Sequence, residues 1–139
     1  MSRLDTLEPA FKIVIEKLLI DLESRTGLSW AVTSARRTIS EQNALYQQGR
    51  TKPGPVVTKA QGGQSAHNFG LAVDLCPFKD GGLYWAAPDD VWHAMAEIAK
   101  EYGLTPGYYF KSFKDMPHLE ASNWKTAQAA WKAGKLEVA

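Results

Sequence analysis

The sequence has little of three things that would narrow its class at once: cysteine, excess charge and long apolar runs. Its 139 residues include one cysteine, so no intramolecular disulfide can form and nothing points to an oxidising compartment. The net charge is +1 and the basic residues are scattered, which argues against affinity driven by a polyanion such as nucleic acid. No segment approaches the roughly 20 apolar residues that span a bilayer. We therefore expect neither nucleic-acid binding nor membrane insertion.

The start of the sequence also lacks the charged segment followed by an apolar segment that marks a signal peptide. The sequence therefore predicts synthesis and folding in the cytoplasm, so that a substrate outside the cell is reached only after release by another factor. Hydrophobic residues make up 45% of the chain and charged residues 22%, as in a globular protein long enough to bury its own core. We expect a single domain over residues 1–139 that acts as a monomer.

The hydrophobic pattern changes between helical and strand-like periods along the chain. An amphipathic helix is expected over residues 7–26 with Gly27 as its C-terminal cap, and the capping-box pattern from Thr38 to Glu41 predicts a second helix start. Further elements are expected as strands at 28–34, at 71–75 and from 118 to 120, and as helices at 39–48, 88–102 and 124–132. This mixture predicts an α+β fold in one small domain.

A long irregular segment separates the early elements from the part of the chain that carries chemistry. Residues 50–66 are rich in proline and glycine and show little periodicity, which predicts a loop. Loops of this length inside a compact domain usually carry function. Cys76 follows the apolar run 71–75 and is expected to be a small buried core residue rather than a reactive thiol.

Two short motifs contain the candidate functional residues. The first, SAHNFGLAVD over residues 65–74, separates His67 from Asp74 by a turn-forming Gly70, a spacing that does not fit adjacent turns of one helix. A loop histidine and a strand carboxylate are therefore expected to meet across a bend. The second motif, DMPHLE over residues 115–120, would add His118 from a neighbouring strand. A carboxylate deep in an apolar run is costly unless it is paired or bound to metal, which favours a shared site over separate structural roles.

Two imidazoles and one carboxylate are the ligand set of a hydrolytic zinc centre, which keeps a fourth position for water. Asp115 is the candidate proton carrier, because an acid near the metal that is not a ligand can take a proton from water and pass it to a leaving amine. A turn acid that bonds to local amides is the alternative. Glu120 shares strand parity with His118 and is predicted to orient that imidazole, although a plain surface glutamate remains open. The sequence predicts a small zinc peptidase.

The two motifs, in this order along the chain, resemble those of the M15 metallopeptidases, the group of D-Ala-D-Ala carboxypeptidases and dipeptidases. Segments 37–46, 48–54 and 111–115 are similar, more narrowly, to the phage L-alanyl-D-glutamate peptidases, which are endolysins that cut the stem peptide of bacterial peptidoglycan. The resemblance runs from about residue 30 to residue 120. The sequence departs from it at 105–110, where relatives often carry a tryptophan- and glycine-rich stretch, so the bond that is cleaved is less closely defined than the metal chemistry.

The resemblance implies a role for each candidate residue. It implies one zinc ion held by His67, Asp74 and His118, with Asp115 as the general base. An arginine after the strand at 28–34 would grip a substrate carboxylate or steady an oxyanion, and although spacing alone does not separate Arg36 from Arg37, the resemblance selects Arg37. It also implies that Ser65 contributes to the site by hydrogen bonding. The implied fold is an α+β domain whose antiparallel sheet carries the metal, with helices packed against it.

Three other functions fit parts of the pattern. Two histidines and a carboxylate also build non-haem iron oxygenases, but those typically place the acid close after the first histidine and do not need Asp115. A metal-stabilised module that binds wall peptide without cutting it is a second alternative, against which Asp115 speaks. The third is a D-Ala-D-Ala carboxypeptidase or dipeptidase, which would use the same metal chemistry to cleave a different bond. The favoured expectation is an L-alanyl-D-glutamate endopeptidase that serves a phage as an endolysin in host lysis.

Overall fold

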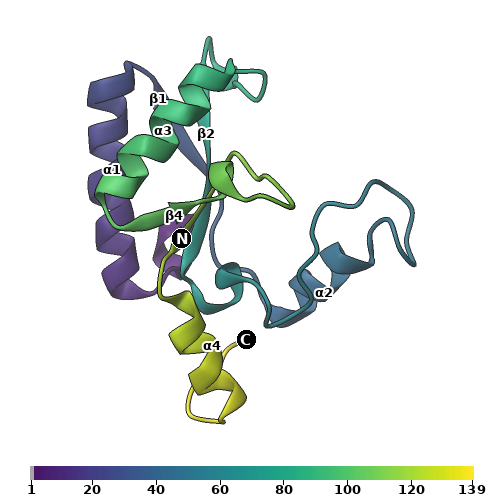
Figure 1. Ribbon diagram of the computed structural model, residues 1–139. Helices are drawn as coiled ribbons and strands as arrows, with labels where there is room; N and C mark the ends of the chain where they lie inside the picture. Colours follow the sequence, from purple (N-terminus) through teal and green to yellow (C-terminus); the bar gives the residue numbers. More distant parts are fainter. Residues whose placement is uncertain (1) are drawn as a thin grey trace.

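An antiparallel sheet forms the centre of the structure, a computed structural model that describes residues 2–139 (Figure 1). The strand order is β1-β2-β5-β4, and β3 pairs with the far end of β2. The strands are β1 (Ser29–Ser34), β2 (Ala72–Lys79), β3 (Gly82–Leu83), β4 (Leu104–Pro106) and β5 (His118–Ala121). The α+β class with an antiparallel sheet, predicted from the sequence, is confirmed.

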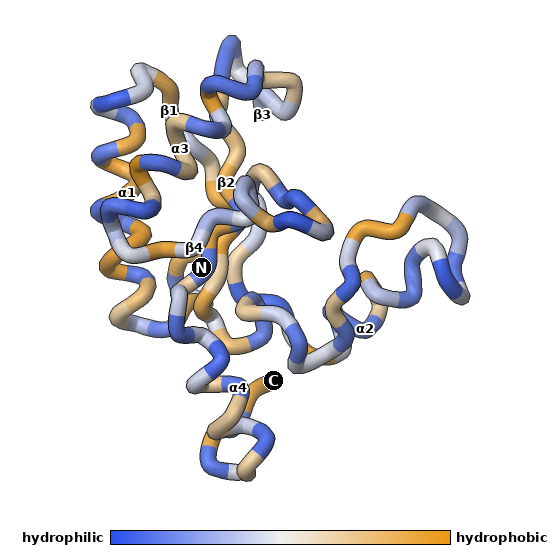
Figure 2. Tube along the Cα trace, in the orientation of Figure 1, coloured by the Kyte–Doolittle hydropathy of each residue, from blue (hydrophilic) through white to orange (hydrophobic). Residues whose placement is uncertain are grey.

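Two helices, α1 (Pro9–Thr26) and α3 (Asp89–Glu101), pack against each other and against the sheet, on the same side of it in Figure 1. Helix α1 buries one stripe at helical spacing, made by Phe11, Ile15, Leu18 and Leu22. This stripe meets buried residues of β1, β2 and α3 in the main hydrophobic core. Figure 2 shows the apolar segments gathered where these elements meet. Cys76 lies in that core as predicted.

Helix α2 (Ile39–Gln47) and the loop after it form an arm, residues 38–64, that projects away from the sheet (Figure 1). The predicted capping box is present, since Thr38 Oγ1 accepts from the Glu41 amide at 3.0 Å and Glu41 Oε1 accepts from the Thr38 amide at 2.9 Å. The loop returns to the sheet through the 3-10 helix η2 (Ala66–Phe69). Helix α4 (Trp124–Lys132) packs against η2 and supports it.

Several boundaries differ from the sequence prediction, each for a local reason. The first helix begins at Pro9 rather than at residue 7, because the Glu8 carboxylate caps the Ala10 and Phe11 amides. A separate 3-10 helix, η1 (Arg3–Thr6), precedes it. Strand β2 continues past residue 75 through Pro77, where a missing N–H is tolerated because β5 pairs only with residues 72–74. Helix α2 ends at Gln47, one residue early.

Two short strands, β3 and β4, were not expected. Gly103, Pro106 and Gly107 predict an interruption of regular structure, yet β4 forms there as a short edge strand paired with β5. The 3-10 helix η3 (Gly107–Tyr109) follows it and opens a loop, residues 107–117, that returns to β5. None of the helices between residues 2 and 139 combines the length and apolar character that crossing a bilayer requires.

Candidate metal centre

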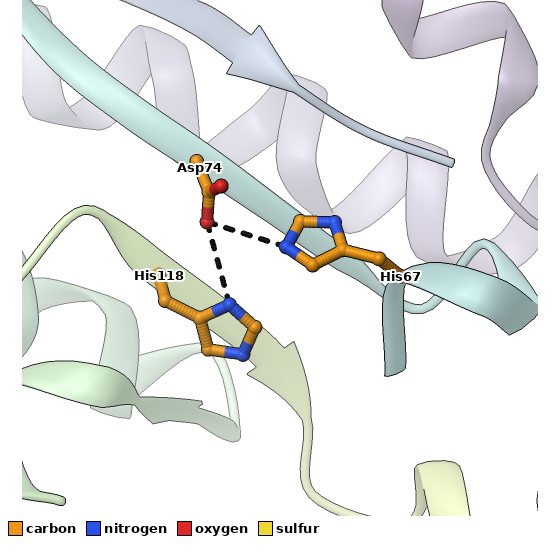
Figure 3. A group of neighbouring side chains, drawn as sticks. All are labelled: His67, Asp74 and His118. Atoms are coloured by element: carbon orange, nitrogen blue, oxygen red, sulfur yellow. Dashed lines mark ion pairs between the residues drawn. The ribbon is translucent and has the colours of Figure 1, made fainter. Parts of the chain in front are cut away.

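Three separate elements bring His67, Asp74 and His118 together: η2, β2 and β5 (Figure 3). Asp74 and His118 are directly opposite in the β2–β5 ladder, so the sheet register alone makes these two side chains neighbours. His67 comes from the other side of a tight bend, in which Gly70 adopts a positive φ of 68°. A left-handed residue here explains the glycine in the motif.

The carboxylate of Asp74 lies between the two imidazole rings. Its Oδ1 is 3.3 Å from His67 Nε2 and 3.3 Å from His118 Nδ1, and one donor atom of each side chain lies within 4.8 Å of the others. Figure 3 shows both rings directed at this oxygen. Both histidines are buried, and Asp74 Oδ1 is a buried atom without a hydrogen-bond partner among residues 2–139.

The outer nitrogen of each imidazole fixes which ring atom carries a proton. His67 Nδ1 lies 2.6 Å from the Ala35 carbonyl oxygen, and His118 Nε2 lies 2.7 Å from Glu120 Oε1. Because both partners are acceptors, each of these nitrogens donates. In the neutral rings the lone pairs of His67 Nε2 and His118 Nδ1 then face Asp74 Oδ1. Three electron-rich atoms converge on one point, and this arrangement favours a bound cation.

The pKa shifts of Asp74 and His118 also indicate that the cluster favours positive charge. Burial opposes the ionisation of Asp74, but the adjoining His118 and His67 outweigh burial and hold the pKa of its carboxyl well below the usual range. Burial also disfavours a charged His118, yet the carboxylates of Asp74 and Glu120 on either side raise its pKa to about 9. The donor set of two nitrogens and one oxygen fits a zinc ion with a free position.

A cavity of about 350 Å³ opens over the cluster. The arm and the 107–117 loop wall it, and Asp115 lines it from the loop. The Asp115 side chain is half-buried, and burial, followed by the negative charge of Asp74, raises the pKa of its carboxyl above the ordinary value. Such an acid accepts a proton more readily than a solvated aspartate does.

Of the two adjacent arginines, Arg37 enters this cavity and Arg36 does not. The Arg37 guanidinium lies 3.9 Å from Asp74 Oδ2, donates to Gln42 Oε1 at 2.8 Å, and is 18% exposed. Burial, the largest influence, lowers its pKa, and the carboxylates of the cavity oppose this. Arg36 points elsewhere, where its Nε donates to the Thr6 carbonyl oxygen at 2.7 Å.

Ser65 and Glu120 each contact one histidine of the cluster. Ser65 Oγ accepts from the His67 amide at 3.2 Å and caps η2, and the residue also lines the cavity. Glu120 accepts from His118 through Oε1, and its Oε2 accepts from Trp124 Nε1 at 2.8 Å. The carboxylate thus links the His118 imidazole to the first residue of α4.

Sequence reasoning missed several polar groups that hold the site. Asn68 is buried, and its side chain accepts from the Gly63 amide at 3.0 Å and donates to the Arg37 carbonyl at 2.9 Å. Gln42 is fully buried and joins Arg37 to the Ala60 carbonyl in the arm. The only available signal for Asn68 was its place beside His67 in the motif. The Ala35 carbonyl acts through the backbone, which residue type does not encode.

Comparison with known proteins places this geometry in a family. Residues 58–121, which contain all three clustered side chains and Asp115, match a peptidase M15 model described as D-alanyl-D-alanine carboxypeptidase. Over 102 residues the chain is 44% identical to the peptidoglycan L-alanyl-D-glutamate endopeptidase CwlK of Bacillus subtilis, a match that covers 68% of this chain and 61% of the relative. The chain thus spans about three fifths of the length of that relative.

Solved structures share the fold at lower sequence identity. The L-Ala D-Glu endopeptidase ChiX of Serratia marcescens matches with a TM-score of 0.59 and 21% identity, over 89% of this chain and 86% of that one. The vancomycin-resistance D,D-pentapeptidase VanY of the VanB-type cassette, solved with Zn(II), matches with a TM-score of 0.62 and 17% identity, over 92% and 79%. The matched segment, the identity to CwlK and the common fold together show that the chain belongs to the M15 peptidase family.

Proposed function

We propose that this chain is a zinc peptidase that hydrolyses the L-alanyl-D-glutamate bond in the stem peptide of bacterial peptidoglycan. The observation that carries the proposal is the convergence of three lone pairs, from His67, Asp74 and His118, on one point at the base of a cavity that Asp115 also lines. The names of CwlK and ChiX, two relatives from different bacteria, support this choice of bond.

His67, Asp74 and His118 would hold one zinc ion through two nitrogens and one carboxylate oxygen. Zinc bound there would supply a Lewis acid that lowers the pKa of water and polarises an amide carbonyl. The Zn(II) complex of VanY supports zinc as the ion. The contacts from the Ala35 carbonyl to His67 and from Glu120 to His118 hold both rings with their inner nitrogens unprotonated, as metal binding needs.

The protein's own side chains would carry the proton and the developing charge. Asp115 would take a proton from the attacking water and deliver it to the departing amine, a task helped by the raised pKa of its half-buried carboxyl. Arg37 would steady negative charge on the scissile carbonyl oxygen, because its guanidinium lines the same cavity. Ser65 would keep η2 in place through its bond to the His67 amide.

The test is mass spectrometry of purified peptidoglycan digested with the protein, with and without a metal chelator. We expect fragments that end in L-alanine together with peptides that newly begin at D-glutamate, and neither product under chelator. Protein that binds the wall polymer yet releases no new termini from several wall types would contradict the enzyme and favour a binding module. Turnover that required iron and oxygen would favour an oxygenase.

A D-Ala-D-Ala carboxypeptidase or dipeptidase is the second candidate, favoured by the description of the matching family model. The same cluster and proton carrier would serve it, and Arg37 would bind the free terminal carboxylate instead. The digest separates the two functions, because a carboxypeptidase removes only terminal D-alanine and leaves the L-alanyl-D-glutamate bond intact.

We also propose that the chain acts as a monomeric catalytic unit over residues 1–139 and serves as a phage endolysin that reaches the wall after release from the cytoplasm. Light scattering coupled to size-exclusion chromatography measures the molar mass, and a mass above that of one chain would contradict the monomer. Turbidity of permeabilised bacteria measures lysis, and an unchanged turbidity at protein concentrations that cleave purified peptidoglycan would contradict the lytic role.

A further inference from the structure

The two walls of the cavity meet at a single lysine. Lys59, on the arm, lines the cavity and reaches across to the 107–117 loop. Its Nζ lies 3.5 Å from the Ser112 carbonyl oxygen and 5.8 Å from the centre of the Phe113 ring. Figure 1 shows the arm and this loop projecting on the same side of the sheet. The Lys59 ammonium group is therefore within reach of a peptide bound in the cavity.

Lys59 and Arg37, the two cationic side chains of the cavity wall, differ in what they already bind. Arg37 is largely buried and donates to Gln42 and Ser34, with Asp74 beside it. Lys59 is exposed, and no carboxylate of residues 2–139 forms an ion pair with it. Its contact with the Ser112 carbonyl is at the long limit of a hydrogen bond, so a better acceptor would replace it readily.

The chemistry that suits this position is a carboxylate. An ammonium–carboxylate hydrogen bond is roughly twice as strong as a neutral one, and the Phe113 ring beside the lysine offers no oxygen that would compete for this bond. The carboxylates that line the cavity, Asp74, Asp115 and Glu120, form no ion pair with Lys59, and a divalent cation and Arg37 would offset their charge. The free positive charge at the wall is therefore available to substrate.

We propose that Lys59 binds the carboxylate of the residue that follows the scissile bond, so that the site prefers acidic peptides over their amidated forms. This inference rests on the proposed function, because it assigns the substrate preference of the same cavity. Lys59 is a specificity-determining residue in this account and has no part in proton transfer. Its removal should therefore raise KM for the acidic peptide and leave kcat nearly unchanged.

The experiment uses two synthetic stem peptides that differ at one group. In one the D-glutamate after L-alanine keeps its free carboxylate, and in the other this group is a carboxamide. Cleavage of both is measured for the zinc-loaded wild type, Lys59→Gln, Lys59→Arg and Lys17→Gln. Lys17 is an exposed lysine of α1 outside the cavity, so its replacement removes the same charge from a remote surface.

We expect the wild type to prefer the acidic peptide, and Lys59→Gln to raise KM for that peptide by about three- to tenfold without a matching change for the amide. Lys59→Arg should keep most of the preference, and Lys17→Gln should equal the wild type. An equal KM change for both peptides in Lys59→Gln, or none for either, overturns the inference while the peptidase function stands. A wild type that cleaves neither peptide overturns the proposed function, and the inference with it.

Discussion

The chemistry of this site is set by individual atoms around two imidazole rings. The Ala35 carbonyl binds one nitrogen of His67 and Glu120 binds one nitrogen of His118, which leaves the other two nitrogens free to face Asp74. Neither arrangement needs the metal to be present first. The candidate ligand atoms are thus preorganised, and the cost of ordering them is met by the fold rather than by ion binding.

Asp115→Asn separates proton transfer from metal binding. Asparagine keeps the size of the side chain but does not accept a proton, so kcat on a peptidoglycan peptide should fall by about 10²- to 10⁴-fold. Zinc content should stay at the wild-type level, because Asp115 is outside the three-residue cluster. Kinetics and metal analysis on the same preparation measure both, and a fully active variant would remove Asp115 from the mechanism.

Glu120→Gln tests the carboxylate that holds His118. Loss of its negative charge weakens the pull on the His118 Nε2 proton and frees the imidazole to turn, so zinc affinity should fall by about 10- to 100-fold. Competition with a chromophoric chelator measures the affinity. Glu137→Gln, at an exposed position near the end of the chain, is the matched control and should bind zinc as the wild type does. Equal affinities for both variants would show that Glu120 does not support the ligand.

At the scale of elements, the site depends on how closely the 107–117 loop folds back on β5. Gly107 accepts from the Asp115 amide through its carbonyl at 3.0 Å, and the Asp115 carbonyl contacts Gly107 at the point where a side chain would begin. A Cβ at Gly107 would also lie 2.9 Å from the His118 Cβ. Glycine is therefore needed here for close approach of two chain segments rather than for an unusual backbone angle.

Gly107→Ala should displace both Asp115, the proposed proton carrier, and His118, a candidate ligand. We expect the free energy of unfolding to fall by about 1–3 kcal/mol, as for other overpacked sites, and kcat to fall with it. Denaturant unfolding and peptide cleavage measure the two effects. Gly82→Ala, in the β2–β3 hairpin where a Cβ meets open space, is the control. If the Gly107 variant unfolds and turns over like the Gly82 variant, the loop adjusts and the packing argument is wrong.

The elements also show how far the sequence predicts the fold. The capping box at Thr38, the Gly27 cap and the bounds of α4 follow from local signals, and the structure has them. Strands β3 and β4 and the second half of β2 were missed because proline and glycine mark turns locally, whereas pairing with neighbouring strands decides their state. Spacing alone did not separate Arg37 from Arg36; the resemblance selected Arg37, and the contact of Arg36 with the Thr6 carbonyl gives the physical reason.

For the whole molecule, the candidate metal centre lies where two separately packed parts meet. The main core fixes β2 and β5 under α1 and α3, while a second cluster of Ala66, Phe69, Ala72 and Trp124 holds η2 against α4. The candidate ligands come one from η2 and two from the sheet, so an ion bound to them joins both packing units. Zinc should therefore stabilise the folded state, and the gain should grow with the logarithm of its concentration once that exceeds Kd.

The most direct test is the zinc content of the purified protein after saturation and removal of excess metal, compared among the wild type, His118→Ala and His93→Ala. His93 is an exposed histidine of α3 outside the cluster. We predict one zinc ion per chain in the wild type and in His93→Ala, and none retained in His118→Ala. A wild type without stoichiometric zinc, or a His118→Ala protein that retains it fully, would contradict the assignment of the metal centre.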